Sequence, residues 1–216
     1  MKQGDISKFK RVVWSYYRKE GRHELPWRKT KNPYRILVSE IMLQQTQVDR
    51  VKPFYAAWLK KFPTVKALAE SPLADVLIAW QGLGYNRRAK MLHEAAKELS
   101  ALPAFPKTPE ELQKLRGIGP YTASAVTAFA FNADTVLIET NIRTAVTHHF
   151  FAKKKHVHDT EVLAVLREVF PKGKSREWYA ALMDYGAHLK RSGVRLNAKA
   201  KGYVKQSAFK GSAREA

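Results

Sequence analysis

Two glutamates have neighbours in the sequence that would shift the pKa of a carboxyl group. The first is Glu40. It lies in an apolar-periodic segment, 36–51, which follows Pro33 and is predicted to be a helix. At helical spacing it shares a face with apolar and amide side chains: Leu37, Leu43, Gln44 and Gln47. Desolvation there would raise the carboxyl pKa, which suits a general acid near neutral pH. The alternative from spacing alone is a surface glutamate paired with a lysine.

The second glutamate, Glu139, follows the apolar run 136–138 and precedes Thr140 and Asn141. This context predicts the start of a helix near Asn141. A carboxylate at that point can accept hydrogen bonds from the first turn and interact with the helix dipole. Capping by itself is therefore a sufficient structural explanation of this residue.

A glycine-containing turn connects a short charged helix to an apolar one rich in small residues. It holds Arg116, Gly117 and Gly119, and the following helix is expected to be buried. We expect both glycines to allow positive backbone dihedrals and to bring amides close to a ligand. With the unpaired N–H groups of the next helix, the turn could hold a DNA phosphate without reading sequence. A tight helix–helix turn that needs glycine only for its geometry is the alternative.

The elements that would position these residues are all predicted to be helices, because apolar residues recur at helical spacing and no segment alternates like a strand. Short connections containing Gly or Pro separate them. Besides 36–51, the predicted helices are 52–61, 72–81, 87–99, 109–115, 121–131, 141–150, 160–169 and 176–189.

The composition of the 216 residues favours a nucleic-acid partner, since 39 Lys and Arg against 19 Asp and Glu give a net charge of +20. A membrane surface or a ribosomal contact is less favoured. The absence of cysteine excludes a disulfide, a thiolate zinc site and a cysteine-ligated cluster. The adjacent histidines, 148–149, predict no metal site. Neither a signal core nor a membrane span is evident, so we expect an intracellular protein of the cytoplasm or nucleoid, without membrane contact.

Two motifs resemble those of a known family. The segments Leu25–Arg28 and Asn32–Val48 resemble the catalytic domain of MutY-type adenine DNA glycosylases, which are base-excision enzymes. Leu115–Ala123 resembles the helix-hairpin-helix motif Leu-Pro-Gly-Val-Gly-x-x-Thr-Ala of the wider HhH-GPD superfamily, with Arg116 in place of the proline. The resemblance runs from Leu25 to about Ala187.

The resemblance implies an all-α, two-lobed HhH-GPD fold with its active site in the cleft between the lobes. A six-helix barrel-type lobe is expected over 30–136, with the hairpin at 109–131. A second helical lobe would comprise 1–29 and 137–190, and a basic tail 191–216. Hairpin carbonyls near Gly117 and Gly119 would hold a potassium or sodium ion, as in the family. No other cofactor is expected.

The same resemblance implies roles for individual residues. Glu40 would protonate the base at N7, while Glu139, where the family normally has aspartate, would stabilise the positively charged sugar with Asn141 beside it. Tyr121 occupies the position of the Schiff-base lysine in bifunctional relatives, so a monofunctional enzyme that leaves an abasic site is expected. The remaining DNA-contact candidates are Tyr85 as the wedge in the base stack, and Arg28, Gln44, Gln45, Arg116, Gly117 and Gly119.

Two departures from the family leave the target base open. Lys190 stands about where cluster-bearing relatives place the first cysteine ligand, and the chain has no room for the domain that recognises 8-oxoguanine opposite adenine. The leading hypothesis is a monomer that removes adenine opposite G or 8-oxoguanine in double-stranded DNA. The alternatives are removal of thymine or uracil from T/G or U/G mismatches, and non-catalytic binding of bent or mismatched DNA.

Overall fold

The structure is a computed structural model that describes residues 3–194 and 196. Every regular element in this part of the chain is a helix, which confirms the predicted all-α class. Most of the predicted tail, 191–216, lies outside the described residues. The helices are α1 (Gln3–Glu20), η1 (Pro26–Arg28), α2 (Pro33–Met42), α3 (Val48–Lys61), α4 (Val65–Glu70), α5 (Leu73–Trp80), α6 (Arg87–Ser100), α7 (Pro109–Leu112), α8 (Pro120–Phe131), α9 (Thr140–Phe150), α10 (Asp159–Val169) and α11 (Ser175–Arg191).

Local side-chain hydrogen bonds explain where several helices begin. Asn32 caps α2 by accepting from the amide of Arg35 at 3.1 Å, and Thr64 caps α4 in the same way. A reciprocal capping box between Thr108 and Glu111 starts α7. Each cap satisfies amides that have no partner within the first turn of a helix.

The predicted helix over 36–51 is wrong in one respect, because α2 ends at Met42 and α3 begins only at Val48. The guanidinium of Arg88, from α6, donates to the carbonyls of Ile41 and Met42 at 3.0 Å each. These carbonyls would otherwise accept amides of the next helical turn. Gln45 then adopts a left-handed backbone with φ 55°, which no continuing helix allows. The segment 43–47 is therefore a loop.

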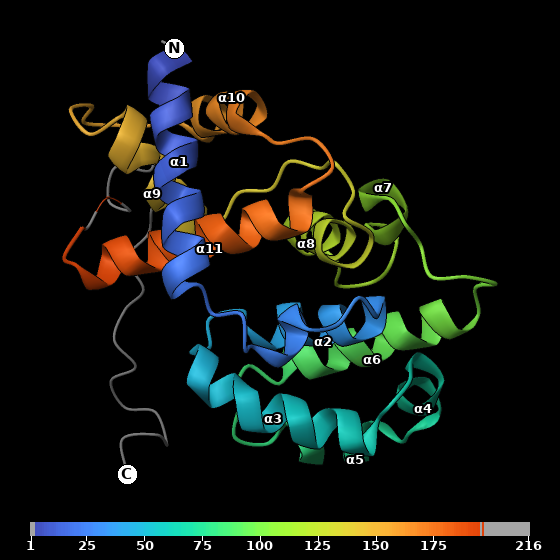
Figure 1. The fold of residues 1–216 in the computed structure, drawn as a ribbon. Coiled ribbons are helices and arrows are strands. Elements are labelled where there is room, and N and C mark those ends of the chain that lie inside the picture. The colour runs from blue at the N-terminus through green and yellow to red at the C-terminus, as the bar shows by residue number, and fades with distance from the viewer. Residues whose placement is uncertain (1–2, 195, 197–216) are drawn as a thin grey trace.

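Two hydrophobic clusters make up the interior of the described chain, and Figure 1 shows α2–α6 of the first below α1 and α9–α11 of the second. The first cluster is formed by η1 and α2–α8, and the second by α1 and α8–α11. Helix α8 belongs to both: Ala123 and Val126 pack in the first cluster, and Ala125 and Ala128 in the second. Small side chains let both groups approach this helix closely. The lobe boundaries given above remain a prediction.

Candidate active site

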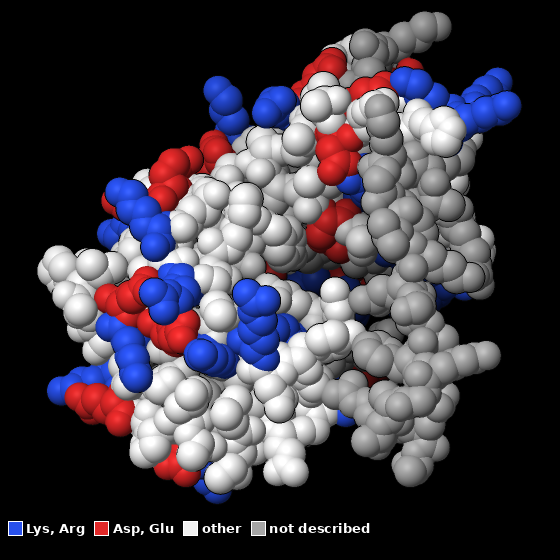
Figure 2. Space-filling view, turned by 180° about the vertical axis from the view of Figure 1, so that it is seen from behind, with Lys and Arg blue, Asp and Glu red and all other residues white. Residues whose placement is uncertain are grey.

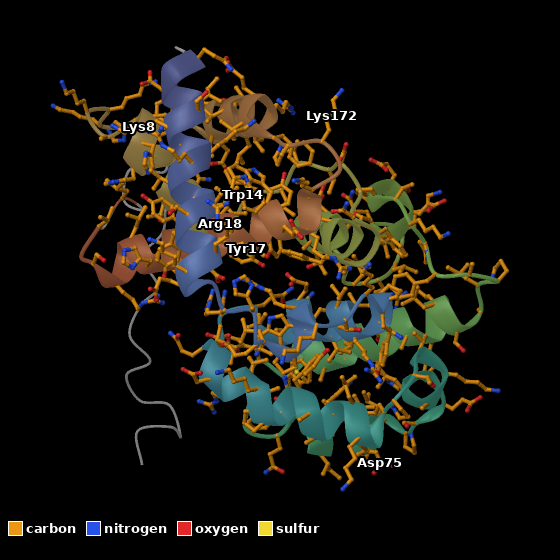
Figure 3. All side chains as sticks on the ribbon, in the orientation of Figure 1. Lys8, Trp14, Tyr17, Arg18, Asp75 and Lys172 are labelled. Atoms are coloured by element: carbon orange, nitrogen blue, oxygen red, sulfur yellow. The ribbon has the colours of Figure 1, made fainter. Side chains whose placement is uncertain are left out.

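A cleft of about 1170 Å³ lies where the two clusters meet. Its walls come from elements far apart in the sequence: the end of α1, η1, α2 and the 43–47 loop, α8, the start of α9, and α11. Tyr17, labelled in Figure 3 near the end of α1, is one of the lining residues. The lining also includes all four residues predicted to be catalytic: Glu40, Tyr121, Glu139 and Asn141.

Glu40 lies on the floor of this cleft in the last turn of α2, with only 7% of the residue exposed. Burial raises its pKa from 4.5 to about 7, aided by the negative charge of Glu139 and opposed by a hydrogen bond from Tyr121 and by the charge of Arg28. Near neutral pH the group is thus poised to give up a proton. The amphipathic-helix argument pointed to this environment, although Gln44 and Gln47 reach the cleft from the loop and not from a longer helix.

Tyr121 connects the hairpin helix to this carboxyl group. Its hydroxyl donates to Oε2 of Glu40 at 3.1 Å. Burial and the two nearby carboxylates hold the pKa of Tyr121 well above its ordinary value, so the phenol stays protonated and remains a donor. The hairpin helix therefore presents a neutral hydrogen-bond donor to Glu40.

Glu139 is the N-cap residue of α9, and its carboxylate turns back onto the helix. Its Oε1 accepts from the amides of Asn141 and Ile142 at 2.7 Å each, and its Oε2 accepts from Thr140 Oγ1 at 3.2 Å and Asn141 Nδ2 at 3.1 Å. The pKa of Glu139 lies above its ordinary value, because burial raises it by more than these hydrogen bonds and the charge of Lys190 lower it. The residue is half-buried and lines the cleft.

A buried ion-pair cluster beside the site was not foreseen from the sequence. Asp184 of α11 accepts from Arg28 at 2.8 and 3.0 Å, and from the amide and Nε of Arg22 at 2.9 and 2.7 Å. Although burial acts to raise it, the charges of Arg28 and Arg22 bring the pKa of Asp184 below its ordinary value. Arg28 lines the cleft, but its guanidinium is bound to Asp184. A contact from Arg28 to a base stays a prediction.

The candidates Gln44 and Gln45 line the cleft, whereas Tyr85 does not belong to its lining. Gln44 is half-buried and donates to Thr122 Oγ1 at 3.4 Å, whereas Gln45 is exposed. Tyr85 is 39% exposed and has a left-handed backbone with φ 51°. The Arg88 guanidinium lies 5.4 Å from the centre of its ring. Strain of this kind persists where the surroundings hold the residue in place, which is typical of functional turns.

The two hairpin glycines differ, and the expectation of positive dihedrals holds only for Gly117. Gly117 has φ 78°, and a Cβ there would lie 2.5 Å from Cβ of Met91. Gly119 has φ −85° as the N-cap residue of α8, and a Cβ there would meet no atom within 4 Å. Its expected left-handed geometry is wrong because it is already extended at the helix start. Arg116 is largely exposed, and its amide donates to Glu98 Oε2 at 3.0 Å.

The described residues contain no group of three His, Cys, Asp or Glu side chains that could hold a metal ion. His149 instead lies 2.8 Å from the hydroxyl of Tyr185 and packs against Phe9. No helix in the described ranges is long and apolar enough to cross a membrane.

Comparison with known proteins identifies the family of this chain. Residues 38–172 match the family model for HhH-GPD superfamily base excision DNA repair proteins. Two similar relatives are adenine DNA glycosylases: that of Buchnera aphidicola subsp. Baizongia pistaciae, 36% identical over 83% of this chain and 52% of the relative, and that of Mycolicibacterium smegmatis, 41% identical over 77% and 58%. The chain thus spans about half the length of the curated relatives that it matches.

Solved structures show the same fold. A thermostable thymine-DNA glycosylase superposes with a TM-score of 0.74 at 24% identity, covering 85% of this chain and 87% of that one. Endonuclease III in a trapped covalent DNA intermediate gives 0.71 at 19% identity, covering 89% and 87%. The chain belongs to the HhH-GPD superfamily of base excision DNA repair proteins.

Proposed function

We propose that this protein is a monofunctional DNA glycosylase that hydrolyses the N-glycosidic bond of adenine mispaired with G or 8-oxoguanine. One observation carries the proposal: a buried Glu40 whose pKa is raised to about 7 shares the cleft with the half-buried, multiply hydrogen-bonded Glu139. Two carboxyl groups in such different environments can hold different protonation states at one pH. The names of the relatives support adenine as the base.

The reaction begins when the target nucleotide leaves the stack and enters the cleft, since a stacked base is out of reach of these groups. Tyr85, exposed on its strained turn, fills the gap that the base leaves in the DNA. Glu40 in its protonated form then transfers a proton to N7 of adenine, which makes the base a better leaving group. The hydroxyl of Tyr121 fixes the orientation of this carboxyl group.

Breaking the bond leaves positive charge on the sugar, which ionised Glu139 stabilises. Its four hydrogen bonds to the start of α9 favour the ionised form and prevent the carboxylate from rotating. Asn141 contributes two of them, one from its amide and one from its side chain. Water then attacks the sugar and gives its proton to Glu40, which became ionised when it protonated the base, and because Tyr121 offers no amine for an imine, the product is an abasic site.

The hairpin supports this reaction by binding the DNA backbone. Gly119 is exposed, has an ordinary backbone conformation and has empty space where a side chain would be. Neither strain nor internal packing therefore requires a glycine here, whereas close approach of a phosphate to the start of α8 would. Backbone carbonyls around Gly117 and Gly119 would hold the potassium or sodium ion that the resemblance implies, and such an ion would add positive charge at the hairpin.

The test is excision from end-labelled duplexes that carry A, T or U opposite G or 8-oxoguanine, analysed with and without alkali. We expect strand breaks only after alkali, and only with adenine duplexes. The E40Q and E139Q variants should bind the same duplexes and release far less base. Product from T/G or U/G duplexes alone would assign the protein to thymine or uracil removal. Binding without release of any base would contradict catalysis altogether.

A further inference from the structure

Lys190 is a cleft residue to which the proposed reaction assigns no role. It lies in the last turn of α11 and lines the cleft with Glu139 and Asn141. One helical turn earlier, Gly186 packs so closely on α9 that a Cβ there would lie 2.0 Å from the carbonyl oxygen of Asn141. Residues four apart share one face of a helix, so Lys190 projects from the face that packs on the start of α9.

The ammonium group of Lys190 makes no direct contact with an anionic side chain in the described part of the chain, although the charge of Glu139 acts on it. It is half-buried, yet it forms neither an ion pair nor a side-chain hydrogen bond with any described residue. The nearest catalytic carboxylate, Glu139, uses both of its oxygens on the first turn of α9. Burial lowers the pKa of Lys190 and the charge of Glu139 raises it. A partly desolvated cation that contacts no carboxylate directly is able to bind an external anion in the cleft.

We propose that Lys190 binds a phosphate that flanks the extruded nucleotide and thereby holds the nucleotide in the cleft beside Glu139. This inference rests on the proposed function, because that reaction places C1′ of the sugar between Glu40 and Glu139. The two flanking phosphates are attached to the same sugar, so one of them comes within reach of a cation on the Glu139 wall. A lysine contacts phosphate as a point charge and positions the backbone without reading sequence.

The test is a double-mutant cycle between protein and DNA. The phosphates on the 5′ and 3′ sides of the target adenosine are replaced one at a time by neutral methylphosphonate. Single-turnover excision then gives the apparent Kd and the rate constant at saturation. For K190Q on unmodified DNA we expect a Kd roughly tenfold weaker, the size of one charge-assisted contact, and a saturated rate constant within about threefold. One methylphosphonate should weaken wild-type binding equally and leave K190Q unaffected.

Two protein controls separate this contact from general charge effects. The K190R variant keeps the charge and should recover most of the affinity. The K172Q variant removes one positive charge from the exposed loop before α11, where Figure 3 shows Lys172 pointing away from the molecule, and should behave as wild type in the cycle. Circular dichroism and thermal melting of each variant show whether it is folded.

The proposal would be overturned if each methylphosphonate weakened the Kd of K190Q by the same factor as that of wild type. A K190Q variant with unchanged Kd, a lower saturated rate and a shifted acid limb would also overturn it, since Lys190 would then act on the charge of Glu139. If no duplex loses a base, the proposed function fails instead. The same cycle is then measured by binding to a duplex with a stable abasic-site analogue, and coupling there would still support the phosphate contact.

Discussion

At the scale of single residues, the burial of Glu40 has a cost in stability that depends on pH. Its pKa rises from 4.5 to about 7 on folding because the ionised carboxylate is desolvated. The folded protein therefore retains a proton that the unfolded chain loses, and stability falls as pH rises from about 4.5 to about 7. Above that range the cost is complete, at roughly 3 kcal/mol.

We therefore expect E40Q to be more stable than wild type at about pH 8 and equally stable near pH 4, as measured by urea unfolding. The same substitution that raises stability at high pH should lower activity. The wild-type kcat/KM should fall as pH rises through about 7, because Glu40 must be protonated to act, and E40Q should lose roughly 10²- to 10⁴-fold. A wild-type excision rate in E40Q would remove Glu40 from the mechanism.

At the scale of elements, the two hairpin glycines are expected to serve different purposes: Gly117 for the backbone conformation of the turn and Gly119 for access of a phosphate. G117A should lower the free energy of unfolding by more than about 1 kcal/mol, because φ is 78° and the new Cβ would collide with Met91. G119A should leave stability unchanged within about 0.5 kcal/mol, since its φ of −85° suits alanine and the space is empty. It should nonetheless weaken DNA binding, because the methyl group holds the phosphate away from the α8 amides.

Thermal unfolding and duplex binding of both variants measure this difference directly. The G117A variant serves as the control for stability, and G119A as the control for loss of binding without loss of fold. If G119A binds DNA like wild type, the phosphate does not approach the hairpin at this residue, and the hairpin glycines serve turn geometry alone.

At this scale the sequence predicts those features that depend on residues close together in the chain. Helical periodicity, prolines at helix starts and the hairpin motif all act over a few positions, so most helices and the Glu40 and Glu139 segments were placed correctly. The end of α2 could not be predicted, because Arg88 of α6 takes its carbonyls. Helix α1 was missed, since only Ile6, Phe9 and Val13 are buried along it.

The arrangement around Lys190 shows the same limit. Its closeness to Glu139 depends on Gly186 fitting against Asn141, a contact between helices that no spacing within either helix reveals. The Arg22, Arg28 and Asp184 cluster is likewise formed by residues more than 150 positions apart. Tertiary packing, and not local propensity, determines these parts of the site.

At the scale of the whole molecule, the net charge of +20 should determine the affinity for DNA and have little effect on the rate constant of base release. On the face shown in Figure 2, Lys and Arg side chains are interspersed with Asp and Glu and do not merge into one patch. Each cation that meets a phosphate releases counterions, so affinity falls steeply with salt. Glu40 is only 7% exposed, and salt screens a buried group much less than a surface charge.

Raising the salt from about 50 to about 200 mM should therefore weaken the Kd for a mismatched duplex by roughly a hundredfold or more. The rate constant of base release at saturating protein should change by less than about twofold. Binding titrations and single-turnover excision across the salt series measure the two quantities separately. K190Q should reduce the slope of log Kd against log salt by about one, while its saturated rate stays as insensitive to salt as that of wild type. If the saturated rate instead falls in parallel with affinity, surface charges help to align the nucleotide with Glu40 during the chemical step. Binding and catalysis could not then be assigned to different parts of the molecule.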